Sequence, residues 1–429
     1  MNQFWKYFPA IYMLPFVFAT TRFDALSAVS EYARWAVMMI ACYFAWQHDF
    51  RRGRGLRMNG FDMAAIGFLG ICVASYFWSI NPTYSVMRAG SMVLLYVASF
   101  WAMWRYMDIY SEDWFWRVLL RALGGVMAVN LLLGSVLLPG ELIAGRFRGF
   151  FENPNNIGLL AGVSLPLVFL YWLRKREKVD FVIAVVISLN VLAAGSRTAI
   201  LAAGLAGLGI VICLMKKRPK LAWASVAAVL LAAVYFIPTD YFTENVLRES
   251  SLENASNRVA FWEYARTFIE RRPVLGHGFG VDAMVWQYYG YDKQMLQLRG
   301  YGVMSSYYGM AVVLGKPVAY AFFTSFWAWV LYGLYKYRTN IVMVGYLLTI
   351  VAGLVTCVFE AALYSAGNAF AYLFWIVVML YLRRDVYKRN GIKLNKRGGL
   401  QRKAKKARRT RTRERKPTKT VEAAAASQT

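Results

Sequence analysis

Apolar runs close to membrane-spanning length recur along most of the chain. A helix that crosses a bilayer needs roughly 20 mostly apolar residues, and flanking Trp and Tyr extend shorter runs into the headgroup zone. The runs are Phe8–Thr20, Tyr32–Gln47, Met63–Trp78, Val86–Trp104, Val118–Leu137, Ile157–Leu173, Phe181–Ala194, Thr198–Met215, Leu221–Ile237, Val318–Leu334, Ile341–Phe359 and Ala361–Leu382. We therefore expect an all-α, polytopic membrane protein of about 12 transmembrane helices.

Short basic clusters follow the even-numbered runs. They are Arg51–Arg57, Arg174–Lys178, Lys216–Lys220 and Lys336–Arg338, and a basic tail follows the twelfth run. Lys and Arg in short loops mark the cytoplasmic side of a membrane protein. The alternation predicts that both termini are cytoplasmic. The loop between the fourth and fifth runs has mixed charge, with Asp108, Glu112 and Asp113 between Arg105 and Arg117.

The charge and length of the loops predict the domain organisation. A transmembrane domain covers residues 1–382, and within it residues 238–304 form one large periplasmic loop. In this loop, Asn257–Arg271 has helical spacing of apolar residues, and Pro273 ends the predicted helix. Residues 383–429 hold 18 Lys and Arg against three acidic residues, and we expect a disordered cytoplasmic tail.

The composition of the chain limits the partners and binding sites that we expect. The chain is 59% hydrophobic and 17% charged, and its net charge is +27. We attribute this positive charge to orientation of the chain in the membrane and to contact with anionic lipid headgroups, and we expect no nucleic-acid partner. All four cysteines lie in apolar runs and only two histidines occur, so we expect neither a metal site nor a cofactor.

Several arginines stand where the outer ends of the runs are predicted. They are Arg88, Arg146, Arg148, Arg197 and Arg258. Each alone fits an interfacial side chain that reaches into water. Together they are unusual outside a membrane, where positive charge is depleted, and guanidinium groups match phosphate oxygens in bidentate geometry. The group predicts binding of a diphosphate headgroup or another anionic substrate.

Other polar residues at the same face have two readings each. Asn153, Asn155 and Asn156 either cap the helix that starts near Ile157 or bind sugar hydroxyls and phosphate. Glu360 is either a general base or an interfacial carboxylate paired with an arginine. We interpret Pro273–Gly280, "PVLGHGFG", as a tight turn that packs the outer loop onto the membrane domain, with His277 as a loop residue.

Four segments in order resemble the O-antigen ligase and O-antigen polymerase family. They are "GRFRGFFENPNNIG", "GSRTAILAAGLAG", "NRVAFWEYARTFIERRPVLGHGFG" and "SSYYGMAVVLGKP", within Gly145–Ala319. The resemblance implies a helical fold like that of type C glycosyltransferases, with a periplasmic loop over the active site in the bacterial inner membrane. It also implies metal-independent transfer of a glycan from an undecaprenyl diphosphate carrier.

Roles for individual residues follow from the same resemblance. Arg197 and Arg258 would neutralise the diphosphate leaving group, with help from Arg146 and Arg148. The segment Ser305–Ser306–Tyr307 would contact the glycan. Family ligases carry a His immediately before this segment, where this chain has Met304. The candidates for the general base are therefore Glu360, His277 and Asp282.

Two enzymes and two other classes of protein fit the sequence. A polymerase would extend lipid-linked repeats of O-antigen or exopolysaccharide, whereas a ligase would move finished glycan to lipid A-core. The partners would be an undecaprenyl diphosphate-linked oligosaccharide, the bilayer, and lipid A-core or other polysaccharide-assembly proteins. A transporter of lipid-linked oligosaccharide or a non-catalytic scaffold would be the alternatives, and the scaffold leaves the outer arginines unexplained.

Overall fold

The computed structural model describes residues 3–49, 58–136, 142–143, 146–215, 258–290, 302–392 and 394. These residues form helices, apart from a hairpin in which β1 (Leu142–Ile143) pairs antiparallel with β2 (Arg146–Phe147). The helices are α1 (Gln3–Phe18), α2 (Asp24–Asp49), α3 (Gly60–Ala74), η1 (Ser75–Trp78), α4 (Pro82–Tyr96), η2 (Val97–Ala102), α5 (Met103–Tyr110), α6 (Glu112–Val136), α7 (Pro154–Lys175), α8 (Lys178–Ala193), α9 (Arg197–Met215), α11 (Arg258–Arg271), α12 (Val285–Tyr288), α14 (Ser306–Tyr337), α15 (Ile341–Phe359) and α16 (Ala369–Arg389).

Six helical segments of the described chain are long and apolar enough to cross a membrane. They are Gly60–Trp78, Pro82–Tyr110, Glu112–Gly134, Pro154–Lys175, Ser306–Tyr337 and Ile341–Phe359. The chain is therefore a multi-pass membrane protein, as predicted, and the expected total of about 12 spans stays a prediction. The expected ninth span, Leu221–Ile237, lies outside the described residues.

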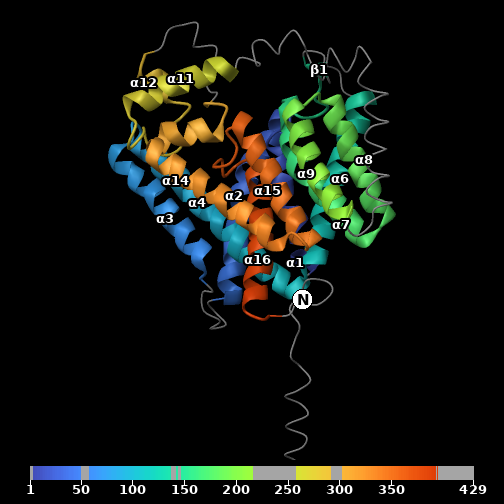
Figure 1. Cartoon of the computed structure of the whole chain (residues 1–429). Helices are drawn as coiled ribbons and strands as arrows, with labels where there is room; N and C mark the ends of the chain where they lie inside the picture. The colour runs from blue at the N-terminus through green and yellow to red at the C-terminus, as the bar shows by residue number, and fades with distance from the viewer. Residues whose placement is uncertain are drawn as a thin grey trace, which may run out of the picture.

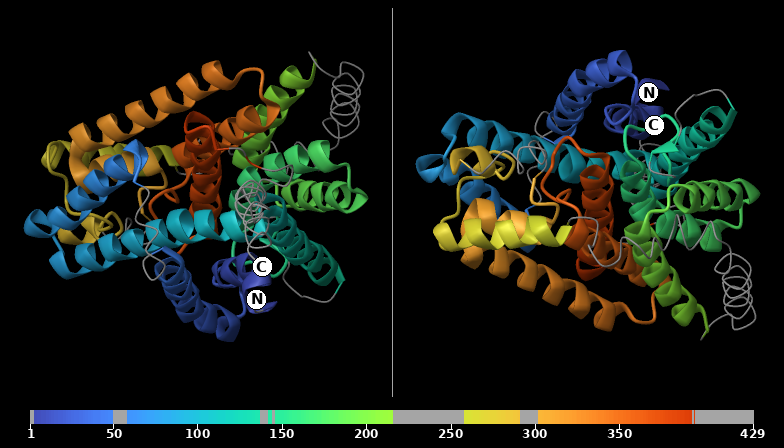
Figure 2. Two further views of the ribbon diagram at one scale, coloured as in Figure 1. Left: turned by 90° about the horizontal axis from the view of Figure 1, so that it is seen from below. Right: turned by 90° about the horizontal axis from the view of Figure 1, so that it is seen from above.

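The helix α16 forms the centre of the bundle (Figure 2). Its side chains from Ala369 to Trp375 and on to Leu382 are almost all buried, against α15, α7, α1 and η2. A helix that is apolar on all sides is stable either in lipid or in a protein core, and α16 lies in the core. The sequence analysis ended the transmembrane domain at residue 382, but the helix continues to Arg389. Residues 395–429 of the predicted tail lie outside the described residues.

The bundle has two chemically different ends. We call the end that carries Arg174, Lys336 and Arg383 the basic end, and the end that carries α11 and α12 the loop end (Figure 1). At the basic end the guanidinium of the fully buried Arg383 lies 2.9 Å from Asp108, and Arg384 lies 2.7 Å from the buried Glu112. The mixed charges of the α5–α6 loop therefore neutralise cations of α16.

Candidate functional site

The guanidinium of Arg146 joins three segments at the loop end. Its Nε donates to the carbonyl of Ala194 at 2.8 Å, and its Nη2 donates to Oδ1 of Asn155 at 2.9 Å. Only 9% of the side chain surface of Arg146 is exposed. This residue therefore ties strand β2 to the start of α7 and to the turn before α9.

The Asn-Pro-Asn-Asn turn has the helix-capping role considered from the sequence, and its binding of sugar hydroxyls or phosphate stays a prediction. Asn153 caps α7, because its side chain accepts from the backbone N–H of Asn155 at 2.8 Å. Asn155 instead uses its side chain to hold Arg146. Asn156 donates its backbone N–H to the carbonyl of Asn153, and Nη1 of Arg148 lies 3.4 Å from the carbonyl of Glu152. The turn thus positions the first arginine pair.

The turn before α9 brings Arg197 close to the same place. Gly195 has a φ of 55°, and Ser196 packs so tightly on Gly158 of α7 that an added Cβ would lie 2.0 Å from the Ser196 hydroxyl. Arg197 is the first residue of α9. Arg197 comes three residues after Ala194, whose carbonyl Arg146 binds, so the backbone of Arg197 lies close to the side chain of Arg146.

The packing of α9 on α15 places Glu360 at the level of Arg197. Gly209 faces Leu348, and Ala202 packs with Ala352. The helices α9 and α15 are antiparallel. If the same pairing of residues continues toward the start of α9, the residues opposite that start lie in the last turn of α15. Glu360, which is half-buried, follows that turn directly.

The start of α14 is fastened to the Glu360 segment. The Ser306 hydroxyl donates to the carbonyl of Glu360 at 2.8 Å and accepts from the N–H of Leu363 at 3.2 Å. Ser305 caps α14 by accepting from the Tyr308 N–H, and the Tyr307 hydroxyl accepts from the indole N–H of Trp327 at 2.9 Å. Each of these hydroxyls, which we expected to contact glycan, therefore makes a structural bond within the protein.

The loop helix α11 covers this region. It begins at Arg258 and ends at Arg271, which confirms the helix predicted from its spacing. The ring of Trp262 stacks on Tyr308 at 5.8 Å and lies 6.0 Å from Phe359, the residue before Glu360. Arg258 lies one turn earlier on α11, at a position on the same face as Trp262; its side chain lies outside the described residues.

Arg88 belongs to a second group of residues. Its side chain packs against Gly280, where an added Cβ would lie 2.8 Å from Cβ of Arg88. The neighbouring carboxyl of Asp282 is only 7% exposed; its burial raises its pKa, and the charge of Arg88 partly opposes that rise. The structure thus places Arg88 near enough to the third candidate base to influence its charge.

The Gly-rich turn packs the outer loop onto the membrane helices, as the sequence indicated. The backbone N–H groups of His277 and Gly278 donate to the carbonyls of Val312 and Val313 in α14 at 3.0 and 2.9 Å. The His277 ring is fully buried, with Nδ1 2.9 Å from the Val312 carbonyl and Nε2 2.9 Å from the Tyr289 hydroxyl. Burial lowers the pKa of this imidazole. His277 therefore serves loop packing.

A buried asparagine pair supports the site and was not anticipated. Nδ2 of Asn130 donates to Oδ1 of Asn190 at 2.9 Å, and Oδ1 of Asn130 accepts from the N–H of Phe150. Both side chains are fully buried. The only signal in the sequence was an amide inside each of two apolar runs.

Among the described residues, no group of three or more His, Cys, Asp or Glu side chains is arranged to hold a metal ion. Metal-independent transfer stays a prediction.

Comparison with known proteins finds a family match for part of the chain. A family model described as O-antigen ligase matches residues 181–311, a segment that includes Arg197, α11 and the start of α14. The match confirms the resemblance found in the sequence motifs. No curated protein matches the chain.

Proposed function

We propose that this chain polymerises lipid-linked repeats of O-antigen or exopolysaccharide, and the proposal is supported by the match of residues 181–311 to a family model described as O-antigen ligase. The substrate is a glycan on undecaprenyl diphosphate, and the reaction takes place at the loop end. In this proposal the loop end is periplasmic, both termini are cytoplasmic, and the protein resides in the bacterial inner membrane. Donor and acceptor are both lipid-linked.

One observation carries the proposal. Three segments far apart in the sequence meet at the end of α15: the Arg146–Asn155 pair, the start of α9 with Arg197, and α11 above Phe359. Arg146 is used to join these segments, whereas Arg197 and Arg258 add further cations at a predicted outer face, where positive charge is usually depleted. Guanidinium groups at this place are suited to a diphosphate.

The chemistry follows from the roles of these groups. The acceptor hydroxyl oxygen forms a bond to the anomeric carbon of the donor, and the bond from that carbon to the diphosphate oxygen breaks. The leaving diphosphate keeps the electron pair, and Arg197 and Arg258 stabilise its growing charge, a large contribution to catalysis in such sites. The hydroxyl proton passes to the carboxylate of Glu360, which the α9–α15 register places at the level of Arg197.

A ligase is the second candidate, because the matching family model is described as O-antigen ligase. Met304 favours the polymerase, because a thioether cannot replace the histidine that family ligases have at this position.

The experiment replaces Arg197 by Ala and, separately, by Lys in cells, followed by electrophoresis of the surface glycan and an immunoblot for protein level. We expect R197A to lose long chains at normal protein level, and R197K to recover part of the length, because Lys keeps the charge but lacks the planar fork. Arg121 provides the control: it pairs with Glu177 near the basic end, so R121A should leave the glycan unchanged.

The phenotype separates the candidates. Loss of a polymerase leaves single repeats on the acceptor, whereas loss of a ligase leaves bare acceptor and accumulated lipid-linked polymer. A transporter variant would trap substrate on the cytoplasmic side. Normal glycan in R197A refutes the proposal. With purified protein and lipid-linked repeats, EDTA should not reduce the rate, and a loss restored by Mg²⁺ would contradict metal independence.

A further inference from the structure

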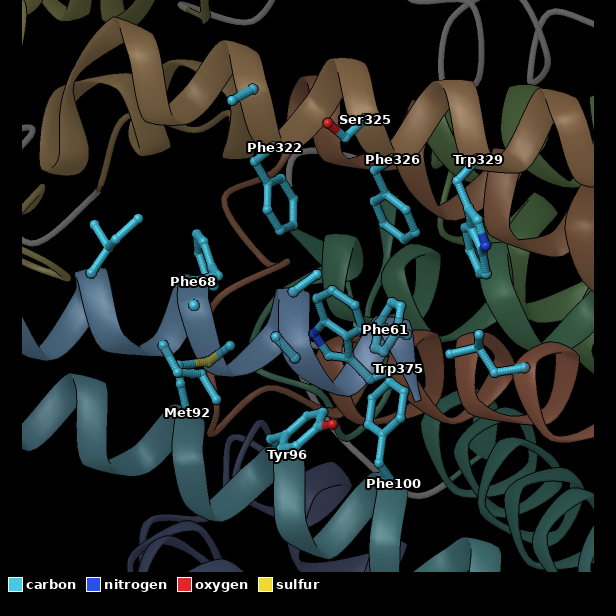
Figure 3. A pocket seen from close by; sticks show the side chains of 18 of the residues that line it. Phe61, Phe68, Met92, Tyr96, Phe100, Phe322, Ser325, Phe326, Trp329 and Trp375 are labelled. Carbon is cyan, nitrogen blue, oxygen red and sulfur yellow. The ribbon is translucent and has the colours of Figure 1, made fainter. Parts of the chain in front are cut away.

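A long apolar cavity of about 790 Å³ lies between α3, α4, η2, α14 and α16 (Figure 3). It runs along α14 from Pro317 to Trp329 and along α3 from Asn59 to Ile71. At 1.5 Å per helical residue, either stretch is roughly 18 Å long, which is more than half of a hydrocarbon core about 30 Å thick.

The walls suit a hydrocarbon chain. Aromatic rings reach between the helices, with Phe68 and Phe322 at 4.8 Å and Phe61 and Trp329 at 6.0 Å between ring centroids. Small residues such as Gly67 open the wall of α3 between these rings. α3 is mostly exposed along its membrane-spanning window, so the helix that forms this wall of the cavity faces the lipid phase. An apolar wall of this kind offers few hydrogen-bond partners to a polar, water-soluble ligand.

Two cations flank the loop end of the cavity without lining it. Arg88 lies one turn from the lining residue Met92 of α4 and interacts with the buried carboxyl of Asp282, whereas Lys316, which directly precedes the lining residue Pro317 of α14, has no ion pair among the described residues. At the opposite end, Arg389 is already bonded to Asp385 at 2.9 Å. The charge thus favours an anionic headgroup at the loop end with its chain directed into the cavity.

We propose that this cavity binds the polyprenyl chain of a lipid-linked substrate, with its phosphate at Lys316. The inference rests on the proposed function, which supplies a substrate carried on such a chain. It adds a second lipid site, on the other side of α14 and α15 from the arginines of α9 and β2. A polymerase joins two lipid-linked molecules and needs two such places.

The test is photolabelling of the purified full-length protein in nanodiscs with a diazirine-bearing geranylgeranyl diphosphate, followed by mass spectrometry of the labelled peptides. Two glycines of α3 give a matched pair: Gly67 lines the cavity, whereas Gly70 does not, and neither has an atom within 4 Å of an added Cβ. We expect label on α3 and α14, and at least tenfold less label in G67W than in G70W. K316Q should weaken competition by polyprenyl diphosphate but not by the uncharged polyprenol.

Equal labelling of G67W and G70W, or displacement of the probe by phosphatidylglycerol as readily as by polyprenyl diphosphate, would overturn the inference. If G67W also keeps normal glycan while R197A loses it, the cavity assignment fails and the glycosyltransferase proposal stands. If the cavity is labelled while R197A has normal glycan, the polyprenyl site stands and the enzyme proposal fails.

Discussion

Replacing Ser306 by Ala would test whether the start of α14 positions Glu360 or contacts glycan. The Ser306 side chain is fully buried and its hydroxyl bonds both the carbonyl of Glu360 and the N–H of Leu363. Alanine fits the same space but removes both bonds. The segment that carries Glu360 would then lose a side-chain attachment to α14.

The cost can be worked out from the two partners. The Glu360 carbonyl keeps the backbone N–H of Ser306 at 3.1 Å, so it loses only one of two bonds, a net effect of about 0.5–1.5 kcal/mol. The N–H of Leu363 loses the Ser306 oxygen in a buried place, which costs about 1–3 kcal/mol if it is left unsatisfied. We therefore expect S306A to destabilise the protein by about 1.5–4.5 kcal/mol.

Buried cysteines provide the assay. Cys72 and Cys357 are fully buried, so a thiol-reactive fluorophore reports unfolding of the detergent-purified protein during heating. S306A should have a lower midpoint than wild type and shorter surface glycan. Ser91 is the matched control, because its hydroxyl bonds only the preceding turn of α4 at 2.7 Å, and S91A should unfold like wild type. A wild-type midpoint in S306A with weaker substrate binding would refute the positioning role and favour direct glycan contact.

Three further changes test the loop end. G315A should unfold at a lower temperature than G70A, because Gly315 has a φ of 84° and an added Cβ would lie 2.0 Å from the Val274 carbonyl. Acidification should destabilise the packing of the outer loop, because burial lowers the pKa of His277. Below about pH 6.5 the unfolded state therefore binds a proton that the folded state does not bind. Limited proteolysis from pH 7.5 to 5 should show a loss of protection in the wild type and none in H277Q. R146K should shorten the glycan, because lysine cannot bond Ala194 and Asn155 with one planar fork, and normal chain length would contradict this role.

Local signals in the sequence predicted much of the fold. The apolar spacing of Val259, Trp262 and Phe268 predicted α11, and Pro273 correctly marked the region after its end. Asn153 was recognised as a cap because an asparagine before a proline and an apolar run is a common helix start. These features depend on a few neighbouring residues, so one sequence is sufficient to predict them.

Contacts between distant segments were not predictable in the same way. The bond from Ser306 to Glu360 joins residues 54 positions apart, and that from Asn130 to Asn190 joins residues 60 positions apart. The sequence predicts that Arg88 and Arg197 both lie at the outer ends of membrane spans. Only the packing of Arg88 on Gly280 shows that Arg88 lies in a different group of residues from Arg197. Side-chain partners of this kind depend on how helices cross, which periodicity does not encode.

The kink in α14 explains how one helix can serve both proposed lipid sites. Val274 of the outer loop approaches the backbone at Gly315, and only a residue without a Cβ leaves room for its carbonyl there. Before the kink, Ser306 holds the Glu360 segment; after it, Pro317 and Phe322 line the apolar cavity. A polyprenyl phosphate in that cavity would have its headgroup at Lys316, beside the turn that docks the outer loop. Binding at the cavity mouth is therefore expected to depend on the same loop packing that positions α11 above Glu360.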